Sequence, residues 1–396
     1  MSHSEISPSN AHRWMRCPGS VKLLRKVPPE TESSEAASLG TRKHALMAQF
    51  ATLFQSALYL GLRMSDVVAA DFLADHPIMS DEIDRETFGN QLVEYAEYLM
   101  CDRQHGNGPA RTEIELPLDL SSVSPGMLGT ADAVIYSHDD TTVEIVDYKS
   151  GSHPVTPRGN EQLMLYLIGA LKMDSDAICN YEGDHLITIA QPSGGDGPLR
   201  FDSRPVSTDT VRDFLFAAQN KATEVRILKN PPRTPSDVAC QWCRAKAICP
   251  DYNEWVGADV LIDACDKEGD VKMSDQLARG ILDNRKRITD LIKSCQEYAV
   301  GKLNNGEDFP GYCLVEKPGR RSVIRSDAIK EALKVLFGLE SLQPVGVGTL
   351  DRLSRENDVD IDFAIERGDP KMTLEPIGDH SGDFKTEEGD ENENKR

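Results

Sequence analysis

The sequence predicts a mixed α/β (α+β) protein with a central sheet flanked by helices. Residues 37–63 and 81–103 carry apolar side chains at the three- and four-residue spacing of amphipathic helices. From Arg111 onward the pattern changes to an alternation of apolar and polar residues, as in Ile114 and Leu116, which is typical of half-buried strands. Helices that precede a run of strands, with a further helix and strand behind them, indicate a sheet covered by helices.

The remaining elements follow from their local patterns. Polar residues at 138–141 predict a hairpin turn between two strands. The first residues lack the basic and then apolar pattern of a secretory signal, and no apolar run is long enough to span a membrane. Both observations favour a cytoplasmic protein. Strands are predicted over 111–118, 127–136, 142–148 and 185–190, and helices over 7–26, 160–173, 207–229, 273–304, 326–337 and 348–355.

Length and composition divide the chain into three parts. A chain of 396 residues is long enough for two or three domains. We expect a first domain over 1–255 with a helical insertion at 45–110, a helical or mixed accessory region over 256–375, and an acidic, disordered tail over 376–396. The net charge of −21 excludes a protein that coats nucleic acid non-specifically, although it allows an enzyme with a local basic groove.

Two carboxylates and a lysine lie on adjacent predicted strands. Asp132 lies on the second strand, and Asp147 and Lys149 are two apart on the third, so that both leave the same face. Paired carboxylates bind Mg²⁺ or Mn²⁺, and a lysine beside the metal can stabilise charge on a phosphate. An Asp-x-Lys sequence on its own is more often a surface ion pair, so the neighbouring motifs decide its meaning.

Those motifs resemble the PD-(D/E)XK nuclease superfamily, and its RecB-like branch in particular. Gly129-Thr130-Ala131-Asp132, Asp147-Tyr148-Lys149 and Gln162-Leu163-Met164-Leu165-Tyr166 are similar to that branch's G-x-x-D, D-x-K and Q-x-x-x-Y motifs, and Gly40-Thr41-Arg42-Lys43-His44 is similar to its upstream G-x-x-x-H. The resemblance covers about residues 7–250 and implies a restriction-endonuclease-like core.

The resemblance also implies roles for individual residues. Asp132, Asp147, His44 and the backbone carbonyl of Tyr148 would hold Mg²⁺ or Mn²⁺, and Lys149 would activate or position the attacking water. Gln162 and Tyr166 lie four apart on one helical face and would brace the site or contact DNA. Weaker candidates for a further carboxylate are Glu113 and Glu115, on the preceding strand.

Three of the nine cysteines lie close together. Cys240, Cys243 and Cys249 form C-x2-C-x5-C, a spacing that suits Zn²⁺ or an iron–sulfur cluster. Spacing alone leaves both open. With Cys17 as the fourth ligand, the pattern is similar to that of AddB-type and CRISPR-associated RecB-like exonucleases, which implies a structural [4Fe–4S] cluster that closes the domain.

The C-terminal region contains a basic patch within an acidic protein. Lys317, Arg320, Arg321 and Arg325 could contact the DNA backbone, or form a solvated strand face. The region resembles a phage-encoded family of uncharacterised function.

Taken together, the resemblance implies a metal-dependent DNA exonuclease of phage recombination, replication or repair. Its substrate would be single-stranded or duplex DNA ends, and its partners a single-strand-binding or annealing protein or a separate helicase, since the chain has no P-loop motif. The alternatives are a structure-specific endonuclease on the same core, an inactive DNA-binding or scaffold protein, and a zinc-stapled protein whose Asp-x-Lys is incidental.

Overall fold

The computed structural model places most of the chain in two compact units, Met1–Ser294 and Cys295–Arg396, which are described separately. The predicted turn around 138–140 and the acidic tail from 377 lie outside the described residues. The structure describes residues 5–28, 35–62, 69–74, 76, 78, 83–100, 111–137, 141–173, 183–257, 275–318, 321–324, 327–337, 347–368 and 370–376.

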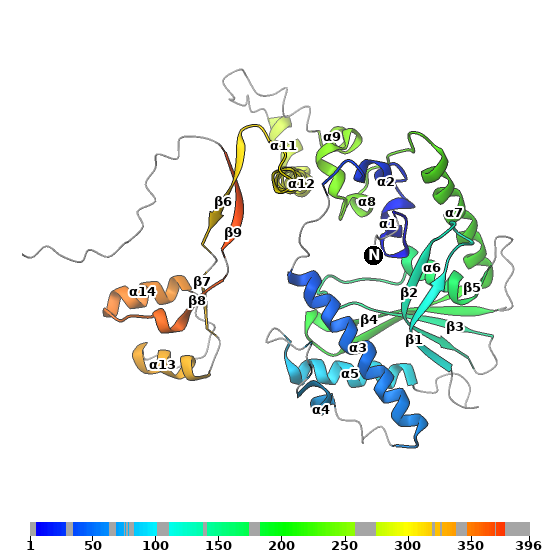
Figure 1. The fold of residues 1–396 in the computed structure, drawn as a ribbon, viewed down its shortest axis with the longest axis horizontal. Coiled ribbons are helices and arrows are strands. Elements are labelled where there is room, and N and C mark those ends of the chain that lie inside the picture. The colour runs from blue at the N-terminus through cyan, green and yellow to red at the C-terminus, as the bar shows by residue number, and fades with distance from the viewer. Residues whose placement is uncertain are drawn as a thin grey trace, which may run out of the picture. The chain divides into compact units, whose positions relative to one another are not determined.

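A five-stranded mixed sheet forms the centre of the first unit, with its strands in chain order (Figure 1). Only the β3–β4 pair is parallel, while β1–β2, β2–β3 and β4–β5 are antiparallel. A parallel pair needs a crossover, and α6 (Glu161–Ala170) supplies it. The strands are β1 (Arg111–Asp119), β2 (Leu128–Tyr136), β3 (Val143–Tyr148), β4 (Asp184–Pro192) and β5 (Leu199–Ser207).

Helices cover both faces of this sheet. On one face, α6 and α7 (Thr208–Ile227) pack in a core that includes Leu163, Leu167 and Leu215. On the other, α3 (Glu35–Tyr59), α4 (Ala69–Ala74) and α5 (Arg85–Met100) pack around a second core. Every residue of β3 is buried as a result. The predicted fold class, a mixed sheet flanked by helices, is therefore confirmed.

The N-terminal segment and the cysteine-rich segment of the first unit lie side by side (Figure 1). Trp14 is fully buried and donates its indole N–H to the carbonyl of Ser7 at 3.0 Å, and the Gly19 N–H donates to the carbonyl of Pro232 at 2.8 Å. The N-terminal segment thereby packs against the cysteine-rich turn. The elements concerned are η1 (Pro8–Asn10), α1 (Ala11–Trp14), α2 (Gly19–Leu24), α8 (Asp237–Cys240), η4 (Arg244–Ile248) and α9 (Pro250–Val256).

Three features differ from the expectations. The predicted N-terminal helix is divided into η1, α1 and α2, and the helix predicted over 273–304 is divided at Asn284 into α11 (Asp275–Asp283) and α12 (Arg285–Asn304). Strand β5 was not predicted, because Pro205 and the exposed Ser203 and Arg204 before it interrupt its pattern at the sheet edge, where proline is tolerated.

The first unit also extends beyond the predicted boundary at 255. The Ser294 hydroxyl donates to the carbonyl of Arg244 and accepts from the N–H of Ala247, both at 3.2 Å. The Tyr252 hydroxyl donates to the carbonyl of Arg287, also at 3.2 Å. These bonds fasten the first part of α12 to the cysteine-rich segment.

The second unit is a small mixed module with its own core of Leu333, Leu350, Ile361 and Ala364. The two helices predicted here are present as α13 (Asp327–Phe337) and α14 (Val347–Asn357). Two antiparallel pairs of strands accompany them: β6 (Tyr312–Lys317) with β9 (Lys371–Pro376), and β7 (Arg321–Val323) with β8 (Ile365–Arg367).

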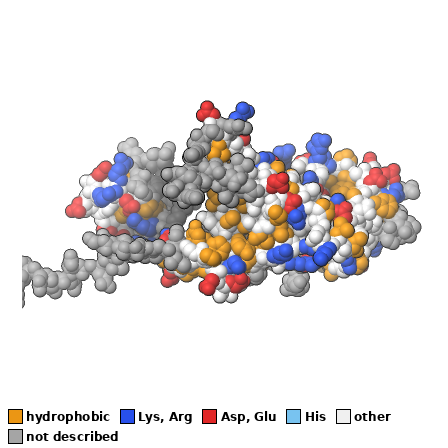
Figure 2. Space-filling view, turned by 90° about the horizontal axis from the view of Figure 1, so that it is seen from above, with side chains coloured by type: hydrophobic (Ala, Val, Ile, Leu, Met, Phe, Trp, Pro, Cys, Tyr) orange, Lys and Arg blue, Asp and Glu red, His pale blue; other side chains and the backbone are white. Residues whose placement is uncertain are grey.

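The surface carries mixed charge. On the face drawn in Figure 2, Lys and Arg side chains are interspersed with acidic and hydrophobic ones. Within the ranges given above, none of the helices has the length and apolar character needed to cross a membrane.

Buried His185 joins the start of β3 to the start of α7. Its Nδ1 accepts from the Val143 N–H at 3.3 Å, and its Nε2 lies 3.0 Å from the Thr208 hydroxyl, which itself donates to the carbonyl of Gly183. An Nδ1 that accepts a hydrogen bond requires a neutral ring. Burial lowers the pKa of His185, although the charge of Asp184 opposes this.

We therefore expect the stability of the protein to fall as the pH decreases from about 6.5 through the lowered pKa of His185, since the unfolded chain takes up a proton that the folded ring excludes. Above pH 6.5 the stabilisation is fully present. His185→Asn should reduce this acid sensitivity in thermal unfolding followed by circular dichroism. Substitution of the exposed His153 by Asn is the control, and an equal effect of both variants would contradict the assignment.

Candidate active site

The site forms where β2 and β3 separate. Their ladder pairs Tyr136 with Val143 at one end and stops at Ala133 and Val146. Beyond that point the two strands are no longer paired, and we call this gap between β2 and β3 the fork. The Asp132 carboxylate lies in it, and its Oδ2 accepts a hydrogen bond from the N–H of Tyr148 at 2.8 Å. A side chain thus takes the place of a ladder partner, because a buried N–H without an acceptor is costly. The fold holds Asp132 at this position independently of any ligand.

Helix α3 brings His44 to the same carboxylate. His44 Nδ1 lies 3.4 Å from Oδ2 of Asp132, and its ring contacts that of Tyr148 edge-on, with centroids 5.1 Å apart. One turn earlier, Gly40 passes close to the loop after β3, where a Cβ would lie 3.1 Å from Oγ of Ser150. The small residue lets the helix approach the ends of the strands closely enough for His44 to reach Asp132.

Asp147 and Lys149 lie on the side of β3 that faces α6. The Lys149 ammonium is 2.7 Å from Oδ2 of Asp147. Gln162 of α6 accepts from Lys149 through its Oε1 at 3.4 Å, and its Nε2 donates to Oδ1 of Asp147 at 3.3 Å and to the Tyr166 hydroxyl at 3.0 Å. The structure therefore links all four of these predicted residues through one amide.

Burial dominates the electrostatics of Asp147. Only 2% of the residue is exposed, and this desolvation raises the pKa of its carboxyl to about 6. The Lys149 ammonium opposes the shift, and the neighbouring Asp132 adds to it. Burial lowers the pKa of His44, but its hydrogen bond to Asp132 and the charges of Asp132 and Asp147 outweigh this and raise it. The site thus concentrates negative charge that a cation would stabilise.

The donor set suits a hard divalent cation, with two carboxylates and an imidazole converging at the fork. Over the described residues, however, no three His, Cys, Asp or Glu side chains have the spacing that one metal ion needs. The Lys149 ammonium also lies 2.7 Å from Oδ2 of Asp147. A cation that binds this oxygen must displace that ammonium.

Two further side chains lie at the fork: Glu115, which the sequence offers only as a weaker candidate, and Tyr95, which it does not indicate as a site residue. Glu115 lines a small cavity together with His44, Asp132 and Tyr148, and so does Tyr95, which lies in the helix predicted over 81–103. Partial burial and the charge of Asp132 raise the pKa of Glu115, whereas His44 lowers it. The other candidate, Glu113, instead pairs with Arg111 at 3.2 Å. Nothing in the alternation of β1 distinguishes these two glutamates.

The predicted basic patch of the second unit has acidic partners where it is described. Lys317 forms an ion pair with Glu375, and Arg321 makes two hydrogen bonds to Asp351, at 2.8 and 3.2 Å. Arg320 and Arg325 lie outside the described residues. The charges of Lys317 and Arg321 are therefore balanced within the module.

The four predicted cysteine ligands gather where the two ends of the first unit meet. The Cys17 sulfur accepts the Thr234 N–H at 3.4 Å, and Thr234 also donates its hydroxyl to the carbonyl of Arg16. Burial raises the pKa of the Cys240 thiol to about 11, and the charges of Cys243, Cys17 and Cys249 add to the shift. Cys17, Cys243 and Cys249 thus lie near enough to act on Cys240, although among the described residues no three of these cysteines have the spacing that one metal ion needs.

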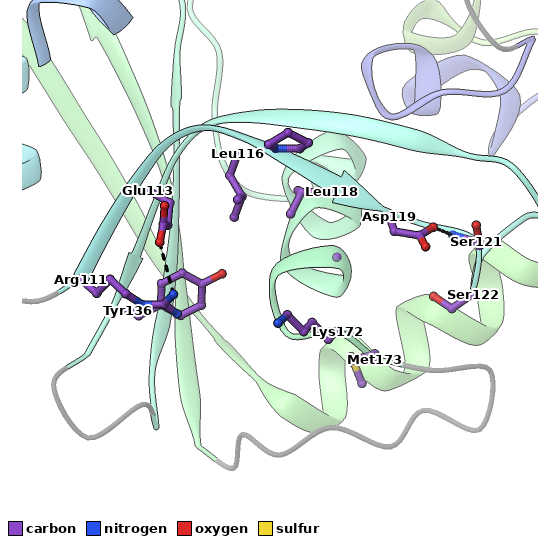
Figure 3. Close-up of a pocket in the computed structure, with 12 residues that line it drawn as sticks. Arg111, Glu113, Leu116, Leu118, Asp119, Ser121, Ser122, Tyr136, Lys172 and Met173 are labelled. Atoms are coloured by element: carbon purple, nitrogen blue, oxygen red, sulfur yellow. Dashed lines mark hydrogen bonds and ion pairs between the residues drawn. The ribbon is translucent and has the colours of Figure 1, made fainter. Parts of the chain in front are cut away.

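A separate pocket of about 720 Å³ lies between β1 and the end of α6 (Figure 3). Arg111, Glu113 and Tyr136 line one side, and Lys172 and Met173 the other. None of the residues predicted to be catalytic borders it. The pocket is therefore distinct from the fork between β2 and β3.

The fold and site define a mixed α/β protein with a carboxylate–lysine centre at the fork of its sheet. A family model described as "Protein of unknown function (DUF2800)" matches residues 3–379, and the chain belongs to that family. Among solved structures, it is similar to the crystal structure of SSO0001, with 19% sequence identity and a TM-score of 0.22. That match covers 35% of this chain and spans 61% of the length of SSO0001.

Gly129 allows Tyr166 to pack behind the site. A Cβ at Gly129 would lie 3.0 Å from Cε1 of Tyr166 and 3.1 Å from Cγ of Pro8. Tyr166 in turn accepts from Gln162, whose first helical turn is held by the Asn160 side chain.

We expect Gly129→Ala to push Tyr166 away and to lower stability by about 1–3 kcal/mol, the usual cost of overpacking. Thermal unfolding and urea titration would measure this. Gly151→Ala is the matched control, because a Cβ there meets nothing within 4 Å. Equal stability of the two variants would show that the close approach at Gly129 is unimportant.

Proposed function

We propose that this protein is a divalent-metal-dependent nuclease that hydrolyses phosphodiester bonds in DNA. The observation that carries the proposal is the convergence at one fork of residues from α3, β2, β3 and α6. Asp132 contacts His44 at 3.4 Å, and Asp147, Lys149, Gln162 and Tyr166 form one hydrogen-bonded chain beside them. A structural ion pair would need only Asp147 and Lys149. The arrangement brings together carboxylates, an imidazole and an ammonium, which suits attack on a phosphate.

The residues divide the work as follows. Asp132, Asp147, His44 and the Tyr148 carbonyl would hold Mg²⁺ or Mn²⁺, which when bound stabilises negative charge on the phosphate under attack. Lys149 keeps a positive charge beside Asp147 and orients a water or a phosphate oxygen. Gln162 holds both side chains in place, and Tyr166 supports Gln162 from the core side.

Exonuclease action is the form of activity that we propose, on the basis of the RecB-like resemblance. DNA ends, single-stranded or duplex, would be the substrate, and a helicase or a single-strand-binding or annealing protein the partner. The net charge of −21 makes local contacts at the fork, rather than a general attraction to phosphate, the expected source of binding.

We expect Asp132→Ala, Asp147→Ala and Lys149→Ala each to lower DNA cleavage by about 100-fold or more, because each removes charge at the reacting phosphate. The assay uses end-labelled linear DNA and closed circular DNA with Mn²⁺ or Mg²⁺. Circular dichroism should show that the variants remain folded.

Glu113→Gln is the control for this series, since Glu113 pairs with Arg111 away from the fork. Loss of linear DNA alone supports an exonuclease, and cutting of circular DNA supports the endonuclease alternative. If the wild type binds DNA but cuts neither substrate with either metal, the protein is a binding or scaffold protein and the proposal is wrong.

We further propose that Cys17, Cys240, Cys243 and Cys249 hold a [4Fe–4S] cluster that closes the first unit. The four thiols influence one another electrostatically, yet no three lie at single-ion spacing within the described residues. Closely spaced thiolates suit Zn²⁺ or an iron–sulfur cluster, and the resemblance to RecB-like exonucleases favours the cluster. Such a cluster would connect the N-terminal segment to the cysteine-rich turn across a very long loop.

Cys17→Ser should lower the iron content of the purified protein from about four atoms per chain and reduce its visible absorption and solubility. Cys295→Ser is the matched control, because Cys295 is an exposed cysteine of α12. Iron content that is unchanged in Cys17→Ser would remove Cys17 from the ligand set. Zinc in place of iron in the wild type would establish the zinc alternative.

A further inference from the structure

We infer that Glu115 is a third acidic residue of the cation site, facing Asp132 and His44 from β1. The inference rests on the proposed function for the identity of the cation, and it assigns to the site a residue that belongs to none of the motifs described above. Its basis is the local geometry of β1 opposite Asp132.

The ladder between β1 and β2 is interrupted at one position. Ile114 pairs with Ala133 and Leu116 with Ala131, while Glu115 and Asp132 between them form no pair. The two strands keep the same register on both sides, so the interruption is not a shift caused by an inserted residue. Glu115 is therefore free of ladder pairing at the position opposite Asp132, whose carboxylate lies in the fork.

The backbone of Glu115 is also unusual. Its φ is +51°, and apart from glycine only Lys172 and Asp358 share a positive φ among the described residues. A long side chain gains nothing locally from this left-handed conformation, which glycine or asparagine adopts more easily. Backbone strain of this kind is concentrated at functional sites, where the surrounding structure enforces it.

The side chains around Glu115 leave room for one small occupant. A cavity of about 10 Å³ is lined by Glu115, Asp132 and His44, with Tyr95 and Tyr148 closing it. That volume is about the least that holds one water-sized particle. Among the described residues nothing forms a hydrogen bond or ion pair with the Glu115 carboxylate, although the charges of Asp132 and His44 act on it.

Two tyrosines that line this cavity have buried hydroxyl groups. Tyr95 and Tyr148 are each only 1% exposed, and within the described part of the chain neither hydroxyl has a hydrogen-bond partner. Buried hydroxyls normally have a hydrogen-bond partner, so each calls for one. A bound cation would provide one, because its carboxylate ligands accept hydrogen bonds and a water ligand donates them.

The test measures Mn²⁺ binding to the full-length protein by calorimetry and by the electron paramagnetic resonance signal of free Mn²⁺. We expect Glu115→Gln to weaken Mn²⁺ binding by about 10-fold or more and to reduce the increase in Tm that Mn²⁺ produces in the wild type. Glu113→Gln is the matched control on the same strand and should bind Mn²⁺ as the wild type does. Unchanged affinity in Glu115→Gln would overturn the inference.

Glu115→Gly guards against a misfolded variant. Glycine suits a φ of +51°, so without Mn²⁺ this variant should unfold at the same temperature as the wild type or higher. Its affinity for Mn²⁺ should nevertheless be lower than that of the wild type. A Glu115→Gly protein that binds Mn²⁺ as tightly as the wild type would likewise refute a ligand role.

Asp132→Asn separates this inference from the proposed function. If Asp132→Asn abolishes Mn²⁺ binding and DNA cleavage while both Glu115 variants bind normally, only the role of Glu115 is wrong. If Glu115→Gln loses Mn²⁺ affinity but the wild type cuts no DNA, the cation site stands and the nuclease proposal is wrong. If the wild type binds no Mn²⁺, both are wrong.

Discussion

The hydrogen bond from the Tyr148 N–H to the Asp132 carboxylate is the constraint on which the site depends. It holds β2 and β3 apart just beyond Ala133 and Val146, where the ladder would otherwise continue. Because an unsatisfied N–H in the buried strand β3 would be costly, the separation of the strands and the position of the carboxylate are one feature. The same carboxylate is the one that His44 of α3 contacts.

The site is supported by parts of the chain that are remote in sequence. Gly129 lies between Tyr166 and Pro8, so the N-terminal segment packs directly behind the tyrosine that contacts Gln162. The same segment carries Cys17 and is bonded to Thr234 beside the cysteine-rich turn. A cluster that fastens these two ends would therefore also hold Tyr166 and Gln162 in position. Stability of the first unit and geometry at the fork are physically coupled.

The pattern of apolar and polar residues was sufficient to predict most of the helices and strands, and the sequence motifs were sufficient to name the residues at the fork. Long periodic segments made α3, α5, α6 and α7 predictable, and β1 to β4 followed from alternation or from continuous apolar runs. Strand β5 was not predictable, because an edge strand with Pro205 and exposed side chains lacks both signals. The attachment of α12 to the first unit through Ser294 and Arg287 depends on bonds to Arg244, Ala247 and Tyr252, which no local pattern contains.

The sequence by itself determined which chemical groups are present and in what order: His44, the two aspartates, Lys149, Gln162 and Tyr166, with four cysteines outside them. Spacing alone placed Asp147 and Lys149 on one face, since side chains alternate along a strand. Only the tertiary structure decided that Glu115, and not Glu113, faces Asp132. The choice depends on an interrupted ladder and a left-handed residue, because both are features of how β1 pairs with β2 and neither is encoded in the alternation of β1.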